Sequence, residues 1–386
     1  MGSPIRVLHV VVNMNRGGAE TLIMNLYRNI DRSKIQFDFL TCKKGVFDQE
    51  ILNLGGKIHR IPYITDGGHF HYIKSLKQFF KANHHYKIVH SHMDKMSGFV
   101  LKAAKKAGIP VRIAHSHNTQ SEGGFAAKIY KDYAGYFISK AATHYMACSK
   151  SAAKWLFKEQ KAILIKNGIL AEAFLYSEEV RRQTRNILNY NKEHFVIGHI
   201  GRFNEQKNHS FLIDIFYELS KVNPNARLLL VGDGTLRTRI ESKVKELKLL
   251  EKVKFLGVRN DIPNLLQAFD VFLFPSLHEG LPVTLIEAQC SGLPCIISDQ
   301  ITEEVDLGLG LVNFNNIKGS PNSWLVNITK RSNRKMNILD GIKSNDYDIK
   351  IGAKKIEKIY ENIIPRNELY KKESSDVSNQ LSIKAR

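Results

Sequence analysis

The sequence predicts an α/β protein built from two doubly wound domains, each with a parallel sheet at its centre. Short runs of β-branched and aromatic residues alternate with helix-period patterns along the whole chain. These runs are apolar throughout, which is typical of parallel strands that helices cover on both faces. A second series of the same kind begins near residue 196, and it indicates a second domain.

The first series predicts seven strands and the second predicts five, with helices between them. In the first series we expect strands at residues 5–12, 37–41, 58–62, 88–92, 111–115, 145–148 and 163–165. In the second we expect them at residues 196–200, 228–231, 253–256, 271–274 and 295–298. Helix patterns lie between them at residues 19–29, 72–82, 97–107, 209–221, 236–248, 262–268 and 283–289.

The length of 386 residues suits two domains, each large enough for its own core. We expect an N-terminal domain over residues 1–172 and a second domain over 173–349, with the boundary in the polar stretch 170–194. Residues 350–364 carry the last amphipathic helix pattern. The polar and charged tail 365–386 is expected to be poorly ordered.

The composition is that of a cytoplasmic protein. Hydrophobic residues make up 43% of the chain, and no apolar run approaches the roughly 18 residues that span a bilayer. The first apolar run, residues 7–12, is short and β-branched, so it predicts a strand rather than a signal peptide. The four cysteines show no metal-ligand spacing, and disulfides are not expected.

The net charge of +20 is concentrated in the first half of the chain. Residues 1–170 carry 26 Lys and Arg against 10 Asp and Glu. Such a basic half indicates an anionic partner, namely nucleic acid, acidic lipid or a phosphorylated acceptor, whereas the alternative is a set of solvated lysines. Lys74, Lys77 and Lys81 form one stripe of the helix pattern 72–82, which suits an acidic membrane surface. The favoured interpretation of this helix is an ordinary amphipathic one with its aromatic residues in the core.

Two carboxylates accompany the clearest strand-to-helix turn, at residues 274–282 (Phe-Pro-Ser-Leu-His-Glu-Gly-Leu-Pro). Glu279 lies in the expected loop, and Glu287 lies eight positions later in the following helix. The carboxyl end of a strand is where open α/β sheets bind their ligands. Pro282 suits the first helical turn, where free amides are available to a phosphate or a sugar hydroxyl. The alternative for Glu287 is a surface glutamate, but apolar neighbours disfavour it.

A basic pair follows the first strand of the second domain, in Gly201-Arg-Phe-Asn-Glu-Gln-Lys207. We expect Arg202 and Lys207 at the carboxyl end of that strand, facing a cleft between the domains. Two cations fixed there neutralise a diphosphate leaving group, a role that a metal ion fills elsewhere. The alternative is two solvated surface charges, and this motif alone does not decide between them.

Glycine-rich turns follow other expected strands. Gly17 and Gly18 lie in Asn13-Met-Asn-Arg-Gly-Gly-Ala-Glu20, where they allow a ligand to approach a helix N-terminus. The turns Val231-Gly-Asp-Gly234 and Phe255-Leu-Gly-Val-Arg259 bring main-chain groups to the same sheet edge. None of the three matches the three-glycine dinucleotide fingerprint or the phosphate-binding loop with its Lys-Ser/Thr ending.

Histidines occur in pairs two residues apart, His90 with His92 and His115 with His117. Alternate residues of a strand share a face, so a metal site is conceivable, but hydrogen-bond donation is the favoured role. The sequence Asp346-Tyr-Asp348 imitates a two-aspartate metal motif. It lacks the apolar strand that should precede such a motif, so we do not expect a metal there.

Together these motifs resemble retaining glycosyltransferases of the GT-B fold, in glycosyltransferase family four, from about residue 5 to residue 364. The segment Arg112-Ile-Ala-His-Ser-His-Asn118 is similar to members that build bacterial capsule or exopolysaccharide. The resemblance implies two Rossmann-like domains that face a cleft, with the last helix crossing back to the N-terminal, acceptor-side domain. It also implies that the second domain binds the nucleotide sugar.

The resemblance assigns roles to individual residues. Arg202 and Lys207 match the family's diphosphate-binding pair, and Glu279 matches the carboxylate near the donor sugar. Glu287 matches the carboxylate on the nucleotide ribose, and the active-site histidine maps to His117, or to His115 in the other register. Further donor-binding positions are Gly17, Gly18, Gly232, Val258, Gly280 and Leu281. The chain departs from the family pattern after Ser298, where Asp299-Gln-Ile-Thr-Glu-Glu304 replaces a glycine-rich segment.

The function that the resemblance implies is retaining transfer of a sugar from a nucleotide diphosphate sugar to a saccharide or lipid-linked saccharide, with no metal cofactor. The expected location is cytoplasmic, at the inner face of the plasma membrane. One alternative is a nucleotide-sugar 2-epimerase on the same fold, which needs no acceptor. The other is a non-enzymatic protein that binds an acidic polymer, although no nucleic-acid-binding motif is present.

Overall fold

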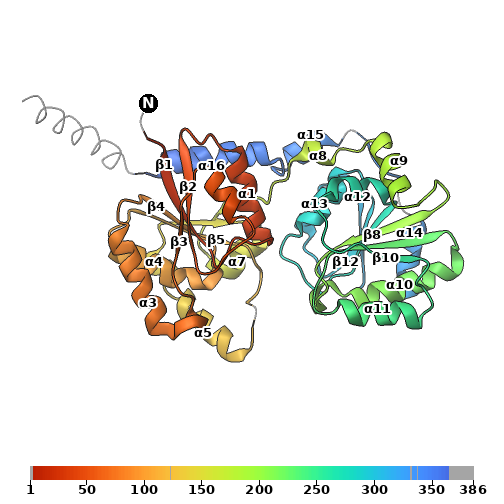
Figure 1. The fold of residues 1–386 in the computed structure, drawn as a ribbon, viewed down its shortest axis with the longest axis horizontal. Helices are drawn as coiled ribbons and strands as arrows, with labels where there is room; N and C mark the ends of the chain where they lie inside the picture. The colour runs from red at the N-terminus through yellow and green to blue at the C-terminus, as the bar shows by residue number, and fades with distance from the viewer. Residues whose placement is uncertain (1–2, 122, 331–332, 337, 365–386) are drawn as a thin grey trace, which may run out of the picture. The chain divides into compact units, whose positions relative to one another are not determined.

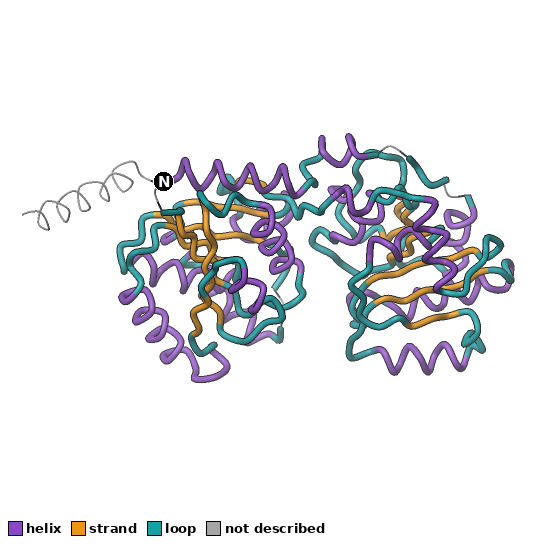
Figure 2. The backbone as a smooth tube through the Cα atoms, turned by 45° about the horizontal axis from the view of Figure 1, so that its top comes forward, coloured by secondary structure: helices purple, strands orange, loops and turns teal. Residues whose placement is uncertain are grey.

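The computed structural model describes residues 3–121, 123–330, 333–336 and 338–364. Residues 3–166 and 350–364 form one compact unit, called unit 1, and Asn167–Ile349 form unit 2 (Figure 1). Each unit contains one parallel sheet with helices on both faces, as Figure 2 shows by colour. The predicted α/β class and the two doubly wound domains are therefore confirmed.

Unit 1 has a seven-stranded sheet in the order β3-β2-β1-β4-β5-β6-β7, and every pair in it is parallel. The strands are β1 Ile5–Val10, β2 Ile35–Thr41, β3 Ile58–Arg60, β4 Ile88–Ser91, β5 Val111–Ser116, β6 His144–Ala147 and β7 Ile163–Leu164. The helices are α1 Gly18–Asn29, α2 Asp48–Asn53, α3 Ile64–Ala82, α4 Ser97–Lys106, α5 Phe125–Gly135, α6 Ile138–Ala141, α7 Lys150–Phe157 and α16 Ile349–Ile363, with a 3-10 turn η1 at Asp94–Met96.

The two faces of this sheet are covered by different helices. Leu8 and Val10 point to a core that includes residues of α3, α4 and α7, whereas His9 between them faces the other side. On that side α16 lies beside α1 (Figure 1), and its Tyr360 reaches His90 of β4. In α3 the aromatic residues Tyr72 and Phe80 are buried, so the favoured amphipathic interpretation of this helix is confirmed.

Unit 2 has a six-stranded sheet in the order β10-β9-β8-β11-β12-β13, again with parallel pairs. The strands are β8 Phe195–Ile200, β9 Ala226–Val231, β10 Val253–Phe255, β11 Val271–Phe274, β12 Cys295–Ser298 and β13 Val312–Asn315. The helices are α8 Ala171–Phe174, α9 Glu178–Ile187, α10 His209–Val222, α11 Arg237–Glu246, α12 Ile262–Ala268, α13 Val283–Cys290, α14 Pro321–Thr329 and α15 Leu339–Ser344, with 3-10 turns η2 Glu205–Lys207 and η3 Glu303–Val305.

The structure differs from the sequence prediction at a few places. Strand β13 was not predicted, because its sequence Val-Asn-Phe-Asn is only half apolar and it pairs with a neighbour on one side alone. The chain enters unit 2 at Asn167 rather than after 172, since Ile169 forms a parallel bridge with Asp348. Helix α9 and the rest of the stretch predicted to hold the boundary belong to unit 2. The predicted tail 365–386 lies outside the described residues.

Both sheets share one topological feature that positions the candidate site. The chain builds strands to one side of β1 and then resumes at β4 on the other side, and it does the same between β8 and β11. At such a switch point the loops leaving the two neighbouring strands run in opposite directions, so the carboxyl ends of the strands are left open to a ligand.

A buried carboxylate connects strands β1 and β2 of unit 1 to the segments that precede β3 and β4. Asp38 of β2 is fully buried and accepts hydrogen bonds from Arg6 Nε (2.6 Å), the Lys57 amide (2.7 Å) and the Tyr86 hydroxyl (2.8 Å). Burial alone would raise the pKa of Asp38, but these hydrogen bonds outweigh it and hold the pKa below its ordinary value. The ionised carboxylate therefore stabilises unit 1 at neutral pH.

Replacing Asp38 with Ala is expected to lower the free energy of unfolding of unit 1 by about 3 kcal/mol, because the Lys57 amide and the Tyr86 hydroxyl lose their buried acceptor. The pKa is lowered in the folded state, so the deficit is full above pH 4 and shrinks as the pH falls below it. Trp155 and Trp324 are the two tryptophans, one in each unit. Urea unfolding in a Trp324→Phe background therefore reports unit 1. A deficit below 1 kcal/mol would contradict the prediction.

Candidate active site

Three loops of unit 2 are joined backbone to backbone at the carboxyl ends of β8, β9 and β10. The Gly201 amide donates to the Val231 carbonyl (2.9 Å), and the Gly232 amide donates to the Gly257 carbonyl (2.8 Å). Gly232 has φ +133°, and a Cβ there would lie 2.1 Å from the Gly201 carbonyl oxygen. Only glycine fits, so Gly232 acts by allowing the loops to approach this closely.

Lys207 and Glu279 form an ion pair on this edge of the sheet. Lys207 Nζ lies 2.6 Å from Glu279 Oε1, and the two side chains are 16% and 8% exposed. The ammonium also lies 4.5 Å from the centroid of the Phe274 ring, which is a cation–π contact. The structure thus brings together two residues that the sequence placed on separate loops.

The backbone around this pair is fixed from both sides. The Asn204 side chain accepts from the Lys207 amide (3.1 Å) and caps the 3-10 turn η2. The Leu277 amide donates to the Gln206 carbonyl (2.8 Å), and Gln206 Nε2 donates to the His278 carbonyl (3.0 Å). The loop after β11 is therefore bound to the loop after β8. Each loop carries one residue of the ion pair, Glu279 on the first and Lys207 on the second.

Two of the predicted positions do not take part in this pair. Arg202 is exposed, and among the described residues no carboxylate pairs with it. Val258 is 62% exposed on the loop after β10. Arg202 thus leaves a guanidinium available to an anionic ligand at the same sheet edge as Lys207.

Helix α13 begins beside Glu279. Pro282 is its N-cap residue rather than part of the first turn, and Leu281 before it is buried. Thr284 and Glu287 are three positions apart on this helix, so they lie on one face. The Thr284 Oγ1 is buried with no hydrogen-bond partner, and the Glu287 carboxylate likewise has none among the described residues. Two polar groups without partners on one face are suited to a ligand that bears hydroxyls.

Glu287 is partly buried, and desolvation raises its pKa to about 7. No neighbouring cation offsets this cost, in contrast to Glu279, which has Lys207. A carboxylate in such a setting gains most from donors that a ligand brings, such as a pair of ribose hydroxyls.

In unit 1, five histidines gather at the carboxyl ends of β1, β4 and β5. His9 Nδ1 lies 2.9 Å from His92 Nε2, and His92 Nδ1 lies 2.8 Å from His117 Nε2. His90 Nε2 lies 3.0 Å from His115 Nδ1. Four of the rings are buried, and His117 is partly exposed. Both predicted registers of the active-site histidine, His115 and His117, therefore belong to one cluster.

Burial keeps these imidazoles neutral. Desolvation lowers the pKa of His9 and of His117 to about 3, and it lowers those of His90, His92 and His115 well below the ordinary value. For the last three, repulsion between the rings adds to this effect. The cluster is thus a set of uncharged hydrogen-bonding groups at neutral pH.

The cluster has the residue type of a metal site, because ring nitrogens of His9, His90 and His92, and again of His92, His115 and His117, lie within 4.8 Å of one another. Neutral imidazole suits Zn²⁺, Cu²⁺ and Ni²⁺. However, the contacts of 2.8–3.0 Å between rings have hydrogen-bond lengths. Each hydrogen bond uses one N–H proton and one nitrogen lone pair, and a metal ion would take that lone pair as a ligand and break the bond.

Gly17 and Gly18 form the start of α1, with Gly17 as an extended N-cap residue. A Cβ on Gly18 would meet nothing within 4 Å, whereas a Cβ on Gly17 would lie 2.3 Å from Glu20 Oε2. The carboxylate of Glu20 thus lies close to the N-terminus of this helix.

The sequence analysis missed three groups of the candidate site, namely His9, Tyr360 and Thr284 of α13. His9 carries a weak signal, because it is a polar residue inside an apolar strand. Tyr360 carries none, because it lies 270 positions from His90, whose Nδ1 it contacts at 2.7 Å.

Comparison with known proteins agrees with this geometry. Residues 16–172 match the family model described as Glycosyltransferase Family 4, and residues 180–305 match the one described as Glycosyl transferases group 1. The chain therefore belongs to glycosyltransferase family 4, and it is a glycosyltransferase.

The chain is similar to several named glycosyltransferases and to solved structures of the same fold. The chain is 41% identical over 337 residues to the putative glycosyltransferase EpsF of Bacillus subtilis (strain 168), which covers 84% of this chain and 87% of the relative. It is 29% identical to the capsular polysaccharide biosynthesis glycosyltransferase CapH of Staphylococcus aureus, over 92% of this chain and 98% of the relative. Among solved structures, Anabaena HepE in complex with UDP and glucose has the same fold, with a TM-score of 0.75, 19% identity, and coverage of 93% of this chain and 100% of the other.

Replacing Glu287 with Gln is expected to stabilise unit 2 by about 2 kcal/mol at pH 8, since it removes a desolvated charge from a partly exposed site. The raised pKa means that the folded wild type binds a proton more tightly than the unfolded chain between pH 4.5 and about 7. Its stability therefore falls as the pH rises through this window, and the advantage of the variant disappears below it.

Urea unfolding followed through Trp324 in a Trp155→Phe background measures this effect at pH 4 and pH 8. Glu246→Gln, at an exposed glutamate of α11, is the matched control and should change stability equally little at both. An advantage of Glu287→Gln that is the same at pH 4 and pH 8 would contradict the assigned desolvation.

Proposed function

We propose that this glycosyltransferase is a retaining, metal-independent enzyme that transfers a sugar from a nucleotide diphosphate sugar to a saccharide or lipid-linked saccharide in capsule or exopolysaccharide biosynthesis. CapH, whose name states capsular polysaccharide biosynthesis, supports the pathway class. HepE, solved with UDP and glucose, supports a uridine nucleotide as donor. We propose a cytoplasmic location for this reaction.

The observation that carries the proposal is the pairing of Lys207 with Glu279 at the switch point of unit 2, on the same sheet edge as Arg202. An incoming diphosphate offers the ammonium a stronger anionic partner than one carboxylate. Lys207 and Arg202 then neutralise the charge that develops on the leaving diphosphate, which removes the need for a metal ion. Glu279 becomes free to accept hydroxyls of the transferred sugar.

In this scheme Glu287 and Thr284 bind the nucleotide. The ribose hydroxyls donate to the Glu287 carboxylate, which has no partner of its own among the described residues. The neutral histidines His115 and His117 of unit 1 hold hydroxyls of the sugar substrates. Binding energy from the nucleotide is thereby used to hold the sugar as it becomes oxocarbenium-like.

Lys207→Ala and Glu279→Ala are each expected to lower kcat/KM for transfer about 100- to 1000-fold, the scale of losing one preorganised electrostatic partner. The donor is first identified by the thermal shift that a panel of nucleotide sugars produces, since a true donor stabilises the folded state. Turnover within 3-fold of wild type in both variants would contradict the proposal. Product made from the donor without any acceptor and without hydrolysis of the donor would favour the 2-epimerase instead.

Either single variant leaves one buried charge unpaired, so a loss of stability must be separated from a loss of function. The double variant Lys207→Met/Glu279→Leu replaces the pair with apolar groups and should remain folded while transfer stays lost. Lys243→Met/Asp214→Leu removes a 2.7 Å ion pair between α11 and α10, and it should leave transfer unchanged.

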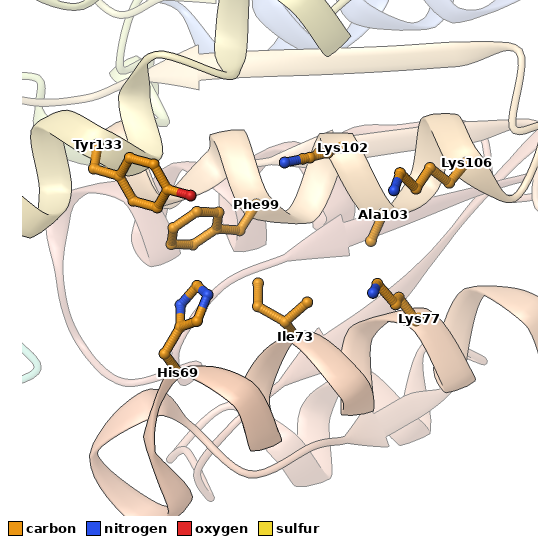
Figure 3. A pocket seen from close by; sticks show the side chains of 8 residues that line it. All are labelled: His69, Ile73, Lys77, Phe99, Lys102, Ala103, Lys106 and Tyr133. Atoms are coloured by element: carbon orange, nitrogen blue, oxygen red, sulfur yellow. The ribbon is translucent and has the colours of Figure 1, made fainter.

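We also propose that unit 1 contacts an anionic membrane, where a lipid-linked acceptor would lie. A pocket between α3, α4 and α5 is lined by Lys77, Lys102 and Lys106 around His69, Ile73, Phe99, Ala103 and Tyr133 (Figure 3). Phe70 and Phe125, on α3 and α5, are 88% and 82% exposed. Lysines and exposed aromatic residues on the same group of helices suit acidic headgroups and the interfacial region. None of the described helices is long and apolar enough to cross a bilayer.

Lys77→Glu/Lys106→Glu is expected to reduce binding to vesicles that contain phosphatidylglycerol at least 10-fold, because each lysine near an anionic surface contributes about 1 kcal/mol. Co-sedimentation measures this binding, and vesicles of phosphatidylcholine alone should not bind the wild type. Lys192→Glu/Lys245→Glu changes the net charge equally at exposed positions of unit 2 and is the control. Equal losses in both double variants would contradict a surface on unit 1.

A further inference from the structure

Tyr360 of α16 starts a chain of hydrogen bonds that ends at His115. The phenol is fully buried, and its hydroxyl contacts His90 Nδ1 at 2.7 Å. Burial raises the pKa of Tyr360 well above its ordinary value, so the hydroxyl keeps its proton. Among the described residues it has no other hydrogen-bond partner. A buried O–H without an acceptor is costly, so Tyr360 donates and His90 Nδ1 accepts.

The direction of this first bond fixes the next ones. A neutral imidazole carries one proton, and His90 therefore holds its proton on Nε2. Nε2 lies 3.0 Å from His115 Nδ1, to which it donates. His115 must then hold its own proton on Nε2, and this atom is buried with no partner among the described residues. The chain thus ends in an N–H group with nothing in the protein to accept it.

A second chain of the same form runs from His9 through His92 to His117. Because all three rings are neutral, their protons must be ordered in one direction. If they run toward His117, His9 keeps an unpaired lone pair on Nε2 beside the Phe37 ring. If they run the other way, His9 keeps an unpaired N–H there. The unpaired group on His117 Nδ1 is the opposite one in each case, so both directions leave one buried N–H and one buried lone pair, and these contacts allow either direction.

We propose that Tyr360 and His90 are positioning residues that fix the tautomer of His115, so that unit 1 presents an uncharged N–H donor, His115 Nε2, to an oxygen atom of the saccharide ligand. This atom is buried and unpartnered among the described residues, which is expected of a donor that awaits a ligand. The nature of the ligand rests on the function proposed above. The direction of the first chain does not, because it follows from the protein alone.

The direct test is the tautomer of each ring in the ¹⁵N-histidine-labelled protein, measured by multiple-bond ¹H–¹⁵N correlation at neutral pH. We expect the proton on Nε2 in His90 and His115, and on the same ring nitrogen, Nδ1 or Nε2, in all three of His9, His92 and His117. His115→Gln and His117→Gln variants assign the two terminal signals. A proton on Nδ1 of His115, or a cationic ring among the five, would overturn the proposal.

Tyr360→Phe removes the donor that starts the first chain and should release the tautomers of His90 and His115 into a mixture, while the second chain keeps its order. Transfer should fall about 10-fold in kcat/KM, which is the scale for residues that hold a functional histidine in place. Tyr27→Phe is the matched control, because Tyr27 is also buried in unit 1 but donates to the Leu54 carbonyl. It should alter no histidine tautomer. Unchanged histidine signals in Tyr360→Phe would overturn the proposal.

The same protein distinguishes this arrangement from a metal centre. Elemental analysis after purification without a metal-affinity tag should find less than 0.1 equivalent of Zn, Cu or Ni, and added Zn²⁺ should leave the imidazole signals in place. A stoichiometric metal that shifts the signals of His92, His115 and His117 would overturn the proposal, since those lone pairs would then be ligands. Unchanged tautomers with no transfer to any acceptor would refute the proposed function and leave this inference standing.

Discussion

The close approach of three backbone turns is the constraint on which the candidate donor site depends. Gly201, Gly232 and Gly257 end neighbouring strands of one sheet, and amide-to-carbonyl bonds of 2.8–2.9 Å connect their turns. No side chain fits where Gly232 faces the Gly201 carbonyl. These backbone bonds alone therefore hold the turn after β8 in place. Lys207 follows that turn, so its position depends on them. The pairing with Glu279 and the link to the α13 helix follow from that placement.

The candidate sites of the two units differ in how their buried polar groups are stabilised. Unit 2 keeps charges, and it offsets the desolvation of Glu279 with Lys207 while leaving Glu287 without a counterion. The histidine cluster of unit 1 carries no charge, because burial lowers the pKa values of its five histidines and leaves neutral rings that bond to one another. A charged site binds ionic ligands such as a diphosphate. A neutral site distinguishes ligands by the positions of their hydroxyl groups.

The sequence predicted most of the fold, because parallel strands buried on both faces are continuous apolar runs. Strand β13 was missed because it alternates polar and apolar residues at the sheet edge. The sequence also predicted that Arg202 and Lys207 follow the first strand of the second domain, as they do after β8, since topology collects the carboxyl ends of strands. Their roles stay predictions. Contacts between distant residues were not predicted. Nothing in local spacing indicates that Lys207 meets Glu279, 72 positions away, or that Tyr360 meets His90.

The place of α16 in unit 1 has a consequence for how the protein is made. Residues 350–364 complete unit 1, yet they are translated only after all of unit 2. A nascent unit 1 can form its sheet and the core against α3 and α4, but the opposite face, with Phe37 and His90, lacks Tyr360 until synthesis has passed residue 360. Domains usually fold in order as they leave the ribosome. Here the first domain to emerge is the last to be finished, and His90 and His115 acquire their final order only after the other domain has been translated.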